Sequence, residues 1–200
     1  EADWLNSLSV TVTSQRERFL TLALSSDKLA IQPYFANLAA TSLGVTNFNR
    51  YKNTIDGQII WYLNHLNKVN NGDVLVYDYN LNRNSDGTYQ EISTSKADSV
   101  DSYHATFLSL LAIKALNDPQ GTSQLFLEPK NKVNLNLIIS SLKLLQVPQK
   151  NYFIAKSDYT MPFTMDNAEV YKGLKDLCGI RNIIPTITTT ENFDWACQMS

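Results

Sequence analysis

Residues 97–113 read ADSVDSYHATFLSLLAI, the pattern of a buried helix with acidic residues at its start. Two carboxylates, Asp98 and Asp101, stand three positions apart, and no further Asp, Glu, Lys or Arg follows them in this stretch. Residues three apart share one helix face, which predicts about 5–6 Å between their Cβ atoms. The pattern is typical both of a helix cap and of a pair of acids presented to a ligand.

Composition limits what kind of protein this is. The chain has 200 residues, and 44% of them are hydrophobic, which is enough to bury one sizeable core. We therefore expect a single helical domain over residues 1–200. The formal net charge is -2, without the basic surface that nucleic acids or anionic membranes attract. The apolar runs are too short to span a bilayer, so no membrane insertion is predicted. The oligomeric state stays open.

Apolar residues recur at helical spacing along most of the chain, which predicts a mainly α fold. Pro33 suits a first helical turn, and Gly44 is typical of a helix end. Two short apolar runs separated by a polar loop instead favour a small β-hairpin, with strands over Val74–Tyr79 and Thr88–Ile92. The expected helices cover residues 14–25, 32–43, 49–69, 99–116, 131–145 and 166–178, and a last one begins at Glu191.

Three segments together resemble the six-hairpin (α/α) toroid glycosidase superfamily: Trp61–Leu66, Ala97–Leu108 and Thr164–Leu174. The second is similar to the acid-Asp-Ser-Tyr helix starts of those toroids, and the third to another helix start that carries a carboxylate. The resemblance implies antiparallel helical hairpins arranged in a ring, with a sugar-binding cleft formed by the loops on one face. A complete toroid has twelve helices, so the smaller number expected here corresponds to part of a ring.

The catalytic candidates are Asp98, Asp101 and Asp166. Glycoside hydrolysis requires two carboxyl groups, one of which keeps its proton. The partial positive charge of a helix N-terminus favours the ionised form. We therefore expect Asp98 or Asp101 to act as a base or as a substrate ligand. The acid then comes from another part of the chain, such as Asp166, Glu91 or Asp78.

Capping alone also explains these carboxylates. Asp98 is a natural N-cap, and Asp101 then takes the position of the acidic residue of a capping box. Asp166 and Glu169 repeat this arrangement at the next helix start. The residues just before Asp166, among them Tyr159 and Phe163, either line a cleft wall or pack in the core.

Five residues are predicted to bind substrate: Tyr77, Tyr79, Trp61, Tyr103 and His104. Aromatic rings stack on the apolar faces of pyranose rings, but they are also common in protein cores. Tyr77 and Tyr79 share one face of the expected strand and are the best candidates. The periodic helix around Trp61 favours the core instead. His104, one turn beyond Asp101, is either an oriented base or a structural histidine.

No motif points to a cofactor or to a metal. Phosphate-binding glycine loops, HExxH, EF-hand loops and dinucleotide fingerprints are absent from the sequence. Cys178 and Cys197 lack the spacing of metal ligands. They can pair if the protein is exported. A secreted or periplasmic location is expected, since polysaccharides are usually met outside the cell.

These observations favour a carbohydrate-active protein with an oligo- or polysaccharide as its partner. The first hypothesis is a glycoside hydrolase that works through carboxylates at helix N-termini. The alternatives are a non-catalytic carbohydrate-binding domain and a helical domain for protein interaction. The enzyme hypothesis requires Asp98 or Asp101 to converge with Asp166 and two aromatic side chains in one groove.

Overall fold

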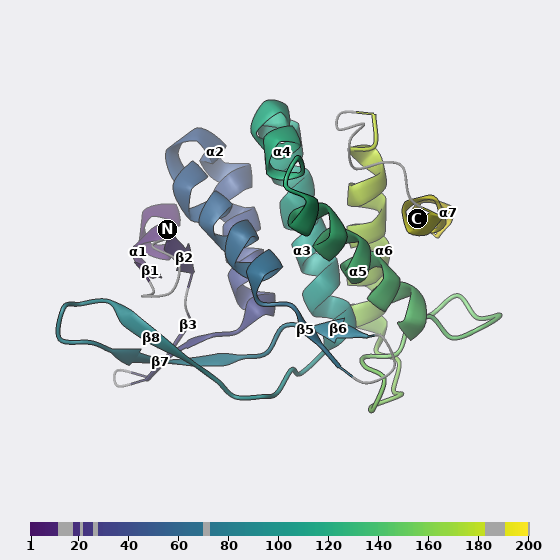
Figure 1. Cartoon of the computed structure of the whole chain (residues 1–200), viewed down its shortest axis with the longest axis horizontal. Helices are drawn as coiled ribbons and strands as arrows, with labels where there is room; N and C mark the ends of the chain where they lie inside the picture. The colour runs from purple at the N-terminus through teal and green to yellow at the C-terminus, as the bar shows by residue number, and fades with distance from the viewer. Residues whose placement is uncertain (12–17, 21, 26–27, 70–72, 183–190, 200) are drawn as a thin grey trace.

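The computed structural model describes residues 1–11, 18–20, 22–25, 28–69, 73–182 and 191–199. This part of the chain is mainly helical with a small antiparallel sheet, as the sequence predicts (Figure 1). Its helices are α1 (Ala2–Ser7), α2 (Pro33–Asn64), α3 (Val100–Asn117), α4 (Pro119–Leu125), α5 (Pro129–Leu145), α6 (Thr164–Gly179) and α7 (Glu191–Gln198). Its strands are β1 (Ser9–Thr11), β2 (Arg18–Leu20), β3 (Leu22–Ser25), β4 (Lys28–Ile31), β5 (Asn67–Lys68), β6 (Val74–Leu75), β7 (Tyr79–Arg83) and β8 (Tyr89–Ser93).

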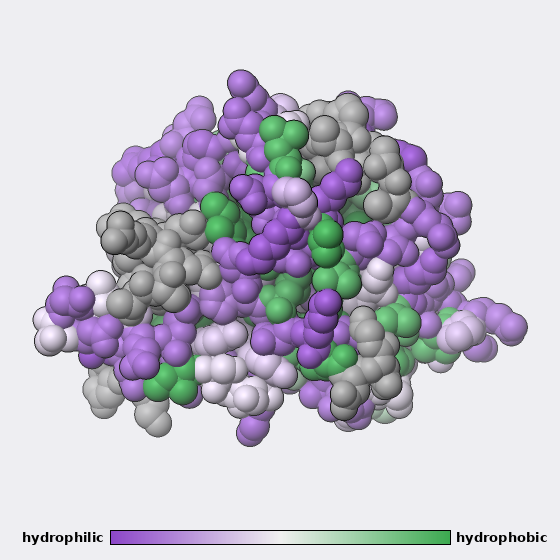
Figure 2. All heavy atoms as spheres, viewed as in Figure 1, coloured by the Kyte–Doolittle hydropathy of each residue, from purple (hydrophilic) through white to green (hydrophobic). Residues whose placement is uncertain are grey.

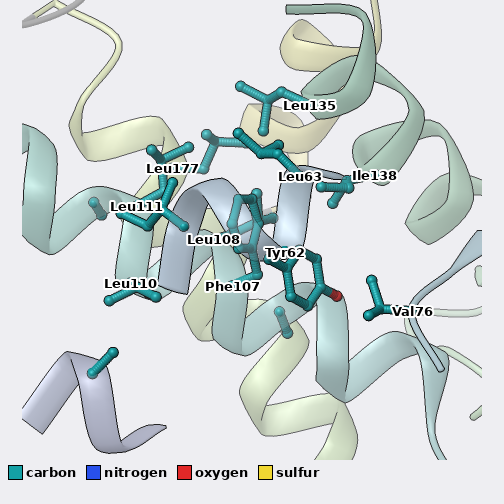
Figure 3. Packing of buried hydrophobic residues seen from close by; sticks show 14 of the residues in the cluster. Tyr62, Leu63, Val76, Phe107, Leu108, Leu110, Leu111, Leu135, Ile138 and Leu177 are labelled. Atoms are coloured by element: carbon teal, nitrogen blue, oxygen red, sulfur yellow. The ribbon is translucent and has the colours of Figure 1, made fainter. Parts of the chain in front are cut away.

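Helix α3 forms the centre of the core. Nearly all of its side chains from Val100 to Ala115 are buried, because α2, α5 and α6 pack around it. The ring of Phe107 stacks on Tyr62 of α2, with 4.3 Å between ring centroids (Figure 3). Gly173 lets α6 come close to α3, since a Cβ atom there would lie 2.6 Å from the carbonyl oxygen of Ala105. A helix that is apolar on all sides is suited to this central place.

The sheet lies across one end of the helices, in the order β3-β4-β7-β8 with all neighbours antiparallel (Figure 1). The predicted hairpin is present, and its loop turns at Gly87, whose φ of 83° favours glycine. The hairpin begins at Tyr79 rather than at Val74, because Val74–Leu75 pairs with β5 instead. It is also extended by strands from the N-terminal part of the chain.

Three predictions about helices are wrong: the helix over residues 14–25, the helix end at Gly44 and the helix end at Val69. Residues 18–20 and 22–25 form strands where a helix over 14–25 was expected; residues 14–17 lie outside the described ranges. A short apolar run fits either period, and pairing of β3 with β4 selects the strand. Helix α2 continues past Gly44, with one non-helical residue at Asn47, and ends at Asn64. Gly44 provides close packing instead, since a Cβ atom there would lie 2.5 Å from a methyl carbon of Ile113.

A disulfide joins the two C-terminal helices. Cys178 of α6 and Cys197 of α7 are bonded, with their Cα atoms 5.3 Å apart. The pairing that the sequence left open is therefore present. On the face shown in Figure 2, apolar side chains lie in small separate groups among hydrophilic ones. Among the described helices, none has the length and apolar character needed to cross a membrane.

Candidate functional site

Helices α2, α3 and α6 all begin beside one cleft of about 740 Å³, next to residues 155–163. Pro33 opens α2, which places Tyr34 and Phe35 in its first turn at the cleft wall. The other two helix starts contribute Ser99, Ser102 and Asp166. Side chains that are far apart in the sequence therefore share one site.

Ser99 links two of the predicted catalytic carboxylates. Its hydroxyl oxygen lies 2.5 Å from Oδ1 of Asp101 and 3.0 Å from Oδ2 of Asp166. These two carboxylate oxygens are thus at most 5.5 Å apart, the sum of the two distances. A serine hydroxyl has one proton to donate. At any moment it can therefore donate to only one of the two carboxylates.

Burial raises the pKa of Asp101. The side chain has no exposed surface, and its pKa rises to about 7, although bonds from Ser99 and the Ser102 N–H act in the opposite direction. Burial therefore opposes the expected effect of the helix N-terminus, which is to keep Asp101 ionised. Loss of water disfavours the charged form more than the helix start favours it. Asp166, by contrast, is partly exposed in the cleft.

The caps differ from those predicted. Ser99, not Asp98, is the N-cap residue of α3, and its side chain caps no backbone amide. The N–H groups of Val100 and Asp101 donate instead to the carbonyl oxygen of Ala155. Because the loop caps the helix, the carboxylates are left for other contacts. Asp98 is exposed just before the helix and lines the cleft.

The start of α6 also lacks the predicted capping box. Phe163 is its N-cap residue, so Asp166 lies within the first turn. Glu169 reaches across to α2, where its Oε1 accepts a 2.5 Å hydrogen bond from the hydroxyl of Tyr34. Burial and this carboxylate raise the pKa of Tyr34 to about 12, so Tyr34 remains a hydrogen-bond donor at neutral pH.

Three buried polar atoms near the cleft floor have no hydrogen-bond partner in the described part of the chain. They are Oδ2 of Asp101, Oγ of Ser102 and Oε2 of Glu169. Leaving such a group unpaired costs about 1–3 kcal/mol. Their proximity to a cleft indicates a place where a ligand or water completes the hydrogen bonding.

The rim of the cleft carries aromatic rings. Phe35, Tyr159 and Phe163 are each nearly half exposed, at 47%, 47% and 43%. The rings of Tyr159 and Phe163 are stacked, with centroids 6.1 Å apart. For Tyr159 and Phe163 the structure selects the cleft wall over the core. Tyr34, Phe35 and Lys156 were missed by sequence reasoning; the Pro33 helix start was the available signal for the first two.

A second cleft of about 820 Å³ adjoins the first and shares Asp98, Lys156 and Asp158 with it. Tyr77 and Asp78 line this second cleft. Tyr103 lines the first, and its hydroxyl donates to Asp78 across 2.8 Å. Burial raises the pKa of Asp78. Tyr77 and Tyr103 therefore each line a cleft, but only 4% of the Tyr103 surface is exposed.

Three predicted binding residues lie in the core instead, and for these the prediction is wrong. His104 is fully buried between the Tyr62 hydroxyl, 2.9 Å from its Nδ1, and the Val74 carbonyl, 2.9 Å from its Nε2. Burial lowers its pKa to about 4, so it is neutral and structural. Trp61 is also fully buried, and Tyr79 packs edge-on against it. These three side chains have little or no exposed surface for a ligand to reach.

Glu91, considered as an acid, belongs to the same buried cluster. Its carboxylate accepts a 2.5 Å hydrogen bond from the indole N–H of Trp61 and lies 3.3 Å from Nε2 of His65. Within the described ranges, no group of three His, Cys, Asp or Glu side chains is placed to hold a metal ion. Comparison of the chain with protein-family models, curated proteins and solved structures finds no match.

Proposed function

We propose that the cleft between the starts of α2, α3 and α6 binds a saccharide. One observation carries the proposal: the half-exposed rings of Phe35, Tyr159 and Phe163 line the same cleft as the hydrogen-bonded pair Ser99 and Asp166. Aromatic rings stack on the apolar face of a pyranose, and carboxylates accept hydrogen bonds from its hydroxyl groups. A cleft that combines aromatic rings with convergent polar groups is typical of a small-molecule site.

Binding without hydrolysis is the function that this geometry favours. A glycosidase brings two carboxyl groups to the scissile bond. Asp98 and Asp166 line the cleft as carboxylates, but Asp101, the one of these aspartates whose pKa burial raises, has no exposed surface from which to give a proton to a substrate. The non-catalytic alternative therefore comes first.

Glycoside hydrolysis is the second candidate, and one observation favours it. The Asp101 and Asp166 oxygens lie no more than 5.5 Å apart through Ser99, which is compatible with the roughly 5–5.5 Å separation of carboxyl groups in retaining enzymes. In that reaction Asp166 attacks the sugar as the nucleophile. The bond from the anomeric carbon to the leaving oxygen breaks as Asp166 bonds to that carbon, while Ser99 gives its proton to the leaving oxygen and takes one from Asp101. Water then hydrolyses the glycosyl–Asp166 ester, and its proton returns to Asp101 through Ser99.

We also propose an arrangement for the helices and a cellular location for the protein. Three helix starts gathered around one cleft support an (α/α) toroid arrangement, of which the described helices form a part. The disulfide between Cys178 and Cys197 supports a secreted or periplasmic location, because disulfides persist in oxidising compartments.

A glycan array, followed by a reducing-sugar assay on the ligands that bind, tests the proposal. We expect Phe163→Ala to weaken binding of those ligands about two- to tenfold, since a stacking ring is worth about 0.5–1.5 kcal/mol. Tyr152→Ala is the matched control, because Tyr152 is also partly exposed but does not line the cleft.

Three results separate the candidates. If no saccharide binds, the proposed function is wrong. If new reducing ends form with the native protein but not with Asp166→Asn, hydrolysis replaces simple binding. If a saccharide binds and stays intact, the binding function stands.

A further inference from the structure

The charges that line the cleft are mostly negative. Asp98, Asp158 and Asp166 bring three carboxylates to its surface, and Lys156 brings one ammonium group. That ammonium group is already engaged, 3.2 Å from the Ala97 carbonyl oxygen and 3.8 Å from the Asp158 carboxylate. Complementary charge on a ligand is positive.

The buried polar atoms provide an independent observation. Ser102 lines the cleft and is 3% exposed, yet its hydroxyl has no hydrogen-bond partner among the described residues. An ammonium group has three N–H donors and no acceptor, so it suits a cleft that offers the Ser102 oxygen and the Asp166 carboxylate as acceptors.

The aromatic rings at the rim of the cleft also favour a positively charged ligand. The half-exposed rings of Phe35, Tyr159 and Phe163 have electron-rich faces that attract a cation. The same faces stack on sugar rings. A saccharide that carries a protonated amine has both a sugar ring that stacks on these faces and a cation that they attract.

We propose that the ligand of this cleft is a saccharide that carries a protonated amine, with its ammonium group bound at the floor by Asp166 and Ser102. The inference rests on the proposed saccharide binding and adds the charge of the ligand to it. It separates amino sugars from neutral and acidic sugars.

Calorimetric titration with two matched tetramers tests the inference. One is a β-1,4-linked glucosamine tetramer in a weakly acidic buffer that keeps its amines protonated, and the other is its N-acetylated, neutral counterpart. We expect the glucosamine tetramer to bind at least about tenfold more tightly. Asp166→Asn should abolish this preference, because an amide of the same shape has no charge.

Asp176→Asn is the matched control. Asp176 lies on the same helix and pairs with Lys172 on the surface, outside the cleft. The preference for the amine should survive in this variant. Ser102→Ala gives a second comparison if Asp166→Asn does not fold, and it should reduce the preference without changing binding of the N-acetylated tetramer.

The outcomes distinguish this inference from the proposed function. Equal affinity for the two tetramers would overturn the inference and leave saccharide binding intact. Absence of binding by any saccharide would overturn both. Spermidine, an amine without a sugar ring, tests the source of the charge: binding as tight as that of the glucosamine tetramer would overturn the assignment to a saccharide.

Discussion

The carboxyl group of Asp101 lies in the first turn of a helix and still has a pKa of about 7. Its environment explains this, since the side chain has no exposed surface and Oδ2 has no partner in the described ranges. Asp166, which contacts the same serine, stays at the surface of the cleft. Burial thus raises the pKa of Asp101 against the effect of its place in the first turn of a helix.

The raised pKa of Asp101 predicts a pH dependence of stability. The folded state binds this proton up to about pH 7 and the unfolded state only up to about pH 4. The group's contribution to stability is therefore fully present below about pH 4 and is lost as the pH rises to 7, by up to about 4 kcal/mol. Asp101→Asn cannot ionise, so it should lack this loss.

Urea unfolding of the native chain and of Asp101→Asn, repeated between pH 4 and 8, measures the effect. The difference between the two free energies of unfolding should shift in favour of the variant as the pH rises. A difference that does not change with pH would contradict the raised pKa.

At the scale of elements, the starts of α2, α3 and α6 build the cleft, and the loop at Ala155 caps α3 in place of a side chain. Close packing of α6 on α3 holds two of these starts together. Gly173 makes that approach possible, because any Cβ atom there meets the backbone of Ala105. The distance between Asp166 and Ser99 therefore depends on Gly173, which lies about two helical turns from Asp166.

Gly173→Ala should destabilise the protein by about 1–3 kcal/mol, since backbone at 2.6 Å cannot move aside as a flexible side chain does. It should also weaken ligand binding by displacing Asp166. Gly179→Ala is the matched control at the end of the same helix, where a Cβ atom would meet nothing within 4 Å. Thermal unfolding of both variants measures the difference, and equal midpoints would contradict the close contact.

At the scale of the whole molecule, the main core around α3 supports the sheet, a smaller cluster of buried residues at the start of α3 lies beside the cleft, and the disulfide joins α7 to α6. Cys178 and Cys197 are 19 positions apart in the chain. A cross-link of this span stabilises the fold mainly by restricting the unfolded chain.

Reduction of the disulfide should lower the free energy of unfolding by about 3 kcal/mol. Thermal unfolding with and without a reducing agent measures this loss. The double variant Cys178→Ser, Cys197→Ser should match the reduced protein and should not respond to the reducing agent. An unchanged midpoint on reduction would show that the bond does not restrain the unfolded chain.

The sequence by itself determined the helices whose signals are local. The helices expected over residues 99–116, 131–145 and 166–178 match α3, α5 and α6 within two residues at each end, because apolar spacing and end residues specify them within one segment. It also singled out the carboxylates at two of these helix starts, although it assigned Asp98 and Asp166 to caps that other residues form.

Contacts between distant segments determined the rest. The strands at 22–25 and 28–31 exist through pairing, which an apolar run does not reveal locally. His104, Trp61 and Tyr79 lie in the core because other segments of the chain pack over them, and burial raises the pKa of Asp101. The meeting of Asp101 and Asp166 at Ser99 depends on how α6 packs against α3, and residues 67 positions apart carry no local signal of that contact.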